Sequence, residues 1–239
     1  MEPGIYENIG DAEYRRIPAI SRSDLLEWAG LAKPIDKTAA TMGIVFHMAM
    51  LEPHLVAESV MVGPEVDRRY TEGKQVWAEA EAKAEERGML LVTPKALDTL
   101  RAMVAGVLHD PQLSKLHKAA KAGQTRNEIT VVWERDGVLL KARIDQATSK
   151  ALIDWKSTGL LEPDDFAASC VGYNYHVQSA MYQDGWATVT GEHLPFIHAV
   201  CSKRQPHPCW LHRIPQSDID HGRTLYETLV RLYARKESK

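Results

Sequence analysis

The stretch from Asn127 to Thr158, NEITVVWERDGVLLKARIDQATSKALIDWKST, places the tightest constraint on the fold. Apolar and polar residues alternate along most of it, which is the period of a strand with one buried face. Asp136-Gly137 is a tight-turn signal, and Thr148-Ser149-Lys150 is a second one. The stretch therefore predicts three consecutive antiparallel strands, at about 127–135, 137–146 and 151–156.

Helical patterns lie on both sides of these strands. Ser21 or Ser23 is a candidate N-cap of a helix that ends at Gly30, and the stretch 38–51 is apolar nearly all round, so it should be a buried helix. The remaining expected elements are helices at 72–88, 93–110, 163–188 and 217–237, and strands within 194–203 and 209–215. We expect an α/β protein that forms a single domain over residues 1–239, with a mainly helical N-terminal part (1–122) and an α/β core (123–239).

Charge and cysteine content exclude several classes of protein. The formal net charge of −3 gives no global basic signal, so nucleic-acid binding would need a local basic surface. The three cysteines form no CxxC pair, which argues against a disulfide framework, a zinc ribbon or a four-cysteine iron–sulfur cluster and fits a reducing cytoplasm. Neither an export signal nor a long apolar window is present, so we expect a cytoplasmic protein without a membrane segment.

The third predicted strand carries two charges among large apolar residues. Asp154 and Lys156 share one face of it, while Ile153 and Trp155 share the other and supply the core contact. Asp145 ends the preceding strand, so two carboxylates can converge, and a divalent cation such as Mg²⁺ or Mn²⁺ would remove their repulsion. The alternative is a salt-bridge cluster on a half-exposed strand, which spacing alone leaves at even odds.

Neighbouring residues favour a phosphate-handling site over that alternative. Ser157 and Thr158 follow the strand and are good phosphate hydrogen-bond donors. Gln178 and Tyr182 lie four residues apart, on one face of the next helix. Taken alone, the Gln/Tyr pair is more typical of a helix rim than of a site.

The combination of Asp145, Asp154-Trp155-Lys156 and Gln178-x-x-x-Tyr182 resembles the PD-(D/E)XK nuclease superfamily, in the subgroup whose downstream helix bears a QxxxY motif. The stretches IPAISRSDLLEWAG, GIVFHMAMLEP and DRRYTEGKQVWAE resemble the RecE-type (exonuclease VIII-like) proteins of phages and prophages. The resemblance covers roughly residues 14–235. It implies a restriction-endonuclease-like core, with a central mixed sheet of about five strands flanked by helices and a helical N-terminal layer.

Carried over residue by residue, the resemblance implies a metal site and its catalytic lysine. Asp145 and Asp154 would be metal ligands together with the backbone carbonyl of Trp155, and Lys156 would be the catalytic lysine. His47 matches an added histidine ligand, although by itself it is more typical of a core histidine on an apolar helix. Glu128 matches an acidic position near the metal, with a solvent-facing residue as the alternative. Gln178 and Tyr182 would contact the DNA strand or position the scissile phosphate.

Candidate phosphate-binding residues are spread along the chain. The resemblance suggests a pocket for a 5′ end at Ser21, Arg22 and Ser23, against the alternative of a plain helix cap. The other basic candidates are Arg68, Arg69 and Lys74, and Lys141 with Arg143 on the hairpin. All of these fit solvated surface equally well.

The function implied by the resemblance is a Mg²⁺-dependent exodeoxyribonuclease, with Mn²⁺ as a possible substitute. It would digest linear double-stranded DNA from 5′ to 3′ and leave 3′ tails for a RecT-like single-strand annealing protein. A homo-oligomer, possibly a ring, in a bacterial or phage-infected cytoplasm is expected. The alternatives are a RecB- or Cas4-like nuclease of other polarity, with the missing cysteine cluster against the Cas4 type, and a non-catalytic DNA-binding module on the nuclease fold.

Overall fold

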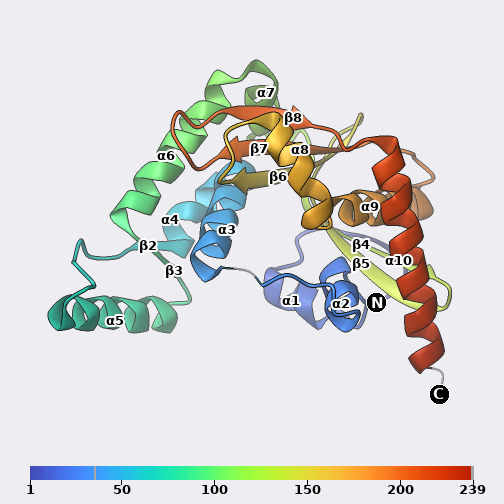
Figure 1. The fold of residues 1–239 in the computed structure, drawn as a ribbon, viewed down its shortest axis with the longest axis horizontal. Coiled ribbons are helices and arrows are strands. Elements are labelled where there is room, and N and C mark those ends of the chain that lie inside the picture. Colours follow the sequence, from blue (N-terminus) through green and yellow to red (C-terminus); the bar gives the residue numbers. More distant parts are fainter. Residues whose placement is uncertain (35, 238–239) are drawn as a thin grey trace.

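A six-stranded mixed sheet forms the centre of the protein in a computed structural model, which describes residues 1–34 and 36–237 (Figure 1). Its strand order is β1-β4-β5-β6-β7-β8, and only β6 and β7 pair in parallel. The strands are β1 (Gly4–Tyr6), β4 (Arg126–Arg135), β5 (Val138–Ala147), β6 (Leu152–Thr158), β7 (Phe196–Ser202) and β8 (Cys209–His212). The predicted α/β architecture is confirmed, with one strand more than expected because β1 adds an edge.

Most of the helices flank this sheet, and they follow the predicted pattern with the exceptions given below. The helices before β4 are α1 (Asp11–Arg16), α2 (Arg22–Trp28), α3 (Lys37–Leu51), α4 (Val56–Ser59), α5 (Thr71–Glu86), α6 (Pro94–His109) and α7 (Pro111–Lys121), with a 3₁₀ turn at Pro53–Leu55. Those after β6 are α8 (Pro163–Gly172), α9 (Tyr175–Thr190) and α10 (Gln216–Glu237). Helices α1, α4 and α7 were not predicted. The single helix predicted over 163–188 is wrong, because Asn174 adopts a left-handed conformation and divides it into α8 and α9.

Two hydrophobic cores lie on opposite faces of the sheet. Helices α2, α8, α9 and α10 pack over one face, where Leu152 of β6 points. Helices α3, α6 and α7 pack over the other, against Ile153 and Trp155. The alternation predicted for this strand is therefore confirmed. The predicted burial of the apolar helix is also confirmed, because Val45 and Phe46 of α3 are buried.

An arm extends from the body of the molecule. Strands β2 (Val60–Val62) and β3 (Leu90–Val92) pair in parallel, and α5 connects them. In Figure 1, α5 lies at the end of this arm, well away from the central sheet. The arm carries three of the predicted basic candidates, Arg68, Arg69 and Lys74.

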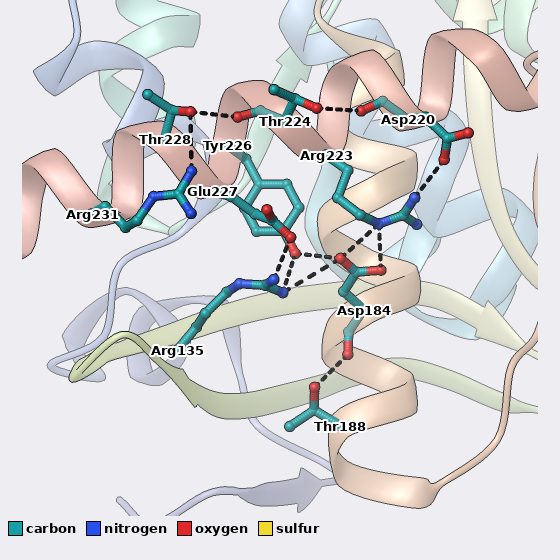
Figure 2. Close-up of polar contacts among 10 residues, drawn as sticks. All are labelled: Arg135, Asp184, Thr188, Asp220, Arg223, Thr224, Tyr226, Glu227, Thr228 and Arg231. Atoms are coloured by element: carbon teal, nitrogen blue, oxygen red, sulfur yellow. Dashed lines mark hydrogen bonds and ion pairs between the residues drawn. The ribbon is translucent and has the colours of Figure 1, made fainter.

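A polar network attaches α10 to the sheet and to α9 (Figure 2). We call it the Asp184 network; its members are Arg135, Asp184, Arg223, Tyr226 and Glu227. Arg135 of β4 pairs with Asp184 of α9 (Nη1–Oδ2 3.5 Å) and with Glu227 of α10. Arg223 Nε also pairs with Asp184 (3.0 Å to Oδ2), and the Tyr226 hydroxyl donates to the same carboxylate. Three elements distant in sequence are thus joined at one acidic side chain.

Within the described ranges, no helix combines the length and the apolar character needed to cross a membrane.

Candidate active site

Strands β5 and β6 separate at the point where the predicted acidic residues lie. Their ladder pairs Ala147 with Leu152 and Gln146 with Ile153, and it includes no pair beyond these. Asp145 comes next on β5, and its Oδ2 accepts a hydrogen bond from the Trp155 backbone N–H at 2.7 Å. A side-chain carboxylate therefore takes an amide that strand pairing would otherwise use, which fixes Asp145 at the fork.

The backbone on the other side of Asp145 is also irregular. Glu128 of β4 lies opposite Asp145 in the register but is not paired with it, and Glu128 has a positive φ of 48°. On β5, Ile144 packs in the core beneath α9, whereas Gln146 donates to the Leu116 carbonyl of α7 on the other face. Residues two apart in a regular strand share a face, so the strand alternation reverses here. Such strained positions concentrate at functional sites.

The kink brings together three groups that we call the acidic cluster: His47, Glu128 and Asp145. One potential ligand atom from each lies within 4.8 Å of the others, and this is the set able to hold a metal ion among the residues that the structure describes. Helix α3 carries His47, whose Nδ1 lies 3.2 Å from Asp145 Oδ2. Arg143 Nε lies 2.9 Å from Glu128 Oε2.

The electrostatics of the acidic cluster suit a divalent cation. Burial, followed by the charge of Asp145, raises the pKa of Glu128 to about 8. Burial also raises the pKa of Asp145, and repulsion by Asp154 adds to it, although His47 acts in the opposite direction. Buried carboxylates that resist ionisation lack sufficient positive charge around them. Carboxylate oxygens suit Mg²⁺ and Mn²⁺, so Glu128 and Asp145 fit the predicted metal.

Asp154 lies in a second group beside the acidic cluster. Its side chain is 3% exposed and forms an ion pair with Lys156 Nζ at 2.6 Å. Gln178 of α9 donates to its Oδ1 at 2.6 Å. Burial lowers the pKa of Lys156, but Asp154, Tyr175 and Asp145 together outweigh this effect, so the pKa is raised and the amine is protonated at neutral pH. The sequence prediction grouped Asp154 with the metal ligands, whereas here both of its oxygens are already occupied by donors.

His198 is a site residue that the sequence reasoning missed. It lies directly beside Asp154 in the parallel β6–β7 pairing, fully buried, with Nδ1 3.0 Å from Asp154 Oδ2. An ionised carboxylate only accepts hydrogen bonds, so the imidazole proton belongs on Nδ1. Burial lowers the pKa of His198, which keeps the ring neutral. A lone histidine in an apolar strand does not by itself indicate a site residue, and its position beside Asp154 depends on how β6 and β7 pair.

Of the three candidate phosphate-binding residues at the start of α2, Arg22 is the one that contacts the site. Arg22 Nη1 donates to Gln178 Oε1 at 3.2 Å. Ser21 is the helix cap and forms a capping box with Asp24, which is the plainer of the two readings. Ser23 is exposed.

The other predicted site residues lie on the two elements beside the site: Tyr182 on α9, and Trp155, Ser157 and Thr158 on β6. Tyr182 follows Gln178 by one turn of α9 and packs edge-on against Phe196, with ring centroids 5.7 Å apart. The Thr158 hydroxyl accepts from the Leu160 backbone at 3.2 Å, so it is engaged in a turn. Ser157 faces Gly43 of α3. The metal-binding role of the Trp155 carbonyl stays a prediction.

The remaining basic candidates have other partners. Lys141 is buried and donates to the backbone carbonyls of Tyr14 and Ile17, so its predicted surface position is wrong. Arg143 is engaged with Glu128. On the arm, Arg68 lies over the Trp77 ring, Arg69 pairs with Asp67 at 2.6 Å, and Lys74 is exposed on α5. The structure does not bring the arm residues to the acidic cluster.

Comparisons with known proteins agree with this arrangement. Residues 21–237 match a family described as a PDDEXK-like domain of unknown function (DUF3799). The crystal structure of a "putative exonuclease" from Eubacterium rectale matches with a TM-score of 0.61 and 15% sequence identity, covering 97% of this chain and 86% of that one. At this identity, the likeness shows the fold alone. No curated protein matches the chain. Because the family match spans nearly the whole sequence, the chain belongs to the PDDEXK-like family DUF3799, within the PD-(D/E)XK nuclease superfamily.

Proposed function

We propose that the protein is a divalent-metal-dependent exodeoxyribonuclease. One observation carries the proposal: the buried carboxylates of Asp145 and Asp154 and the half-buried Lys156 lie together where β5 and β6 separate, with Gln178 bound to Asp154. A salt-bridge cluster on an exposed strand, the plainer reading of these charges, would be solvated. A module that only binds DNA has no need of buried carboxylates with insufficient counter-charge.

The residues of the site have different roles in the proposed phosphodiester hydrolysis. His47, Glu128 and Asp145 would hold the cation, with Asp154 and the Trp155 carbonyl beside them. Bound there, Mg²⁺ or Mn²⁺ supplies Lewis-acid stabilisation of the phosphate and a water of lowered pKa. Lys156, protonated and next to Asp154, stabilises the negative charge that develops on the phosphate oxygens. Gln178 is fixed between Arg22 and Asp154, and it orients both toward the DNA strand.

The finer assignment rests on the resemblance of the N-terminal stretches to the RecE type. On that basis the enzyme digests linear duplex DNA from 5′ to 3′ and leaves 3′ tails for a RecT-like annealing protein during homologous recombination. Arg22 is the candidate for a 5′-phosphate contact, and the arm residues Arg68, Arg69 and Lys74 are candidates for a contact with the duplex. We further propose a homo-oligomer, with a ring as its expected form, in the bacterial or phage-infected cytoplasm. The match to a protein named as an exonuclease supports exonuclease activity.

The test is digestion of a linear duplex labelled at either its 5′ or its 3′ end, beside the same DNA as a closed circle. In Mg²⁺ or Mn²⁺, the 5′ label should appear early as a mononucleotide, the 3′ label should be retained in long strands, and the circle should survive. EDTA should stop the reaction. Early release of the 3′ label would reverse the polarity, and cleavage of the circle would make the protein an endonuclease. Binding without cleavage in both metals would refute nuclease activity and favour the DNA-binding module.

A further inference from the structure

The break between α8 and α9 places two tyrosines side by side. Residues two apart in a continuous helix point to different sides, so Tyr173 and Tyr175 could not meet within one. Asn174 adopts φ 57° and ψ 31° between them and ends the helical path. As a result, the two rings stack, with centroids 5.7 Å apart and planes inclined by 23°. The break is therefore a device that builds an aromatic pair.

The inner ring of this pair touches the candidate active site. Lys156 Nζ lies 5.0 Å from the centroid of the Tyr175 ring. The same ring lies 5.4 Å from that of His198, which bonds to Asp154. Tyr175 is thus packed against groups that surround the reacting phosphate in the proposed function, and its position is fixed on that side.

The outer ring is open to solvent and has a cation beside it. Tyr173 is 55% exposed, which is high for an aromatic side chain with an ordered stacking partner. Lys33, in the segment between α2 and α3, has its Nζ 5.2 Å from the Tyr173 centroid. The Asn174 side chain donates to the Leu31 carbonyl at 3.4 Å, which connects this segment to the helix break. An exposed ring with an exposed ammonium next to it provides a surface for a base and a charge for a phosphate.

We propose that Tyr173 is a stacking platform for an unpaired nucleobase of the strand being digested, close to the scissile phosphate. Tyr175 supports the platform from behind, and Lys33 moves from the ring to the phosphate of the stacked nucleotide. Aromatic rings bind single-stranded nucleic acid in this way because every base has a π face. The stack continues into the site through Tyr175 and Lys156, which favours a nucleotide over a protein partner. The inference rests on the proposed nuclease function and names a DNA contact of the same site.

DNA affinity measured in EDTA tests the stacking platform without cleavage, because the proposed reaction needs a divalent metal. The probes are duplexes with a short unpaired 5′ end, either intact or with an abasic nucleotide at one of the four terminal positions in turn. Tyr173→Ala should weaken binding to the intact DNA on the order of tenfold, whereas Tyr173→Phe, which keeps the ring, should stay within about twofold. On the abasic duplex that lacks the stacked base, wild type and Tyr173→Ala should bind equally. Lys33→Gln should reduce the slope of log affinity against log salt by roughly 0.7.

Two results would overturn the proposal. One is an unchanged affinity of Tyr173→Ala for intact DNA. The other is a loss that is the same on every abasic duplex, since it would then not depend on a base. A thermal melt of Tyr173→Ala checks that the fold is kept. The proposed function can be refuted separately. A wild-type protein that neither binds nor cuts DNA would refute the proposed nuclease function. Normal cleavage by the wild type, with an unchanged DNA affinity of Tyr173→Ala, would refute only the stacking platform.

Discussion

Two acidic side chains, the half-buried Asp184 and the buried Asp145, lie on neighbouring elements and have opposite surroundings. Asp184 of the Asp184 network receives two arginines and a tyrosine hydroxyl (Figure 2). Asp145 of the acidic cluster receives His47 and one backbone N–H, and it lies near Asp154 and Glu128, which are also acidic. The first carboxylate is fully compensated within the protein. The second is left with a deficit of positive charge, and this deficit distinguishes a site that binds a cation from one that joins helices.

Removing Asp154 or Lys156 should have the largest effect, a loss of nuclease activity in a protein that still folds. In Asp154→Ala and Lys156→Ala, nuclease activity on linear duplex DNA should drop by about 10³-fold or more, because charge stabilisation at the reacting phosphate is lost. Circular dichroism should show the native fold in both. A fully active Asp154→Ala protein would refute the assignment of the site.

Removing Asp184 should have the converse effect. Asp184→Ala leaves Arg135 and Arg223 without their shared partner, so the free energy of unfolding measured in urea should fall by about 3 kcal/mol. This value lies near the lower end of the losses measured when one partner of a buried ion pair is removed, because the Asp184 side chain is 18% exposed. Specific activity at low temperature should be unchanged, since the network does not contact the site. A stable but inactive Asp184→Ala protein would contradict the contrast between the two regions.

Metal should stabilise the protein through the acidic cluster. At a Mn²⁺ concentration 100 times the Kd, the stabilisation is about 2.7 kcal/mol, which corresponds to a rise in Tm of roughly 5–10 °C over the EDTA-treated protein. Asp145→Asn should abolish this rise, and it should melt at or above the wild-type Tm in EDTA because a repulsive charge is gone. Arg223→Gln, a variant in the Asp184 network, is the control and should keep the full metal-dependent rise.

The smallest effect concerns the pH dependence of stability in EDTA. The pKa of Glu128 is raised from 4.5 to about 8 in the folded protein, so between these values the unfolded chain ionises and the folded one does not. Stability conferred by the neutral form is complete below pH 4.5 and is lost as the pH rises toward 8. Glu128→Gln cannot ionise, so its Tm relative to wild type should be a few degrees higher at pH 8 than at pH 5. An equal difference at both pH values would show that Glu128 is ionised in the fold.

The sequence predicted what depends on local pattern. The Asp136-Gly137 turn and the alternation through Ile153 and Trp155 gave the hairpin and the core-facing side of β6, because turn chemistry and period 2 are properties of short segments. The break at Asn174 was not predicted, since a non-glycine residue with positive φ in a helical pattern has no reliable local signal. Short β1 is likewise stabilised by its neighbour β4 more than by its own residues.

The site was predictable only as a list of residue types. The motif residues Asp145, Asp154 and Lys156 could be named from order and spacing, but the partners that decide their chemistry come from tertiary register. His198 meets Asp154 through parallel pairing, and Glu128 meets Asp145 through a kink that reverses the strand alternation. Both depend on how strands align across the sheet, and a single sequence does not encode that alignment locally.

The parallel pairing of β6 with β7 also has a consequence for how the chain is assembled. Parallel neighbours need a crossover connection, and here α8 and α9 supply it, so Gln178 is delivered over Asp154 by the same unit that brings His198 beside it. These contacts link nearby parts of the chain and can form early. Helix α3 leaves the ribosome well before the central strands, yet its apolar surface has no sheet to cover until β6 has been synthesised. His47 therefore reaches Asp145 only after β5 and β6 have been synthesised, and the nascent chain cannot complete its cation-binding residues before that point.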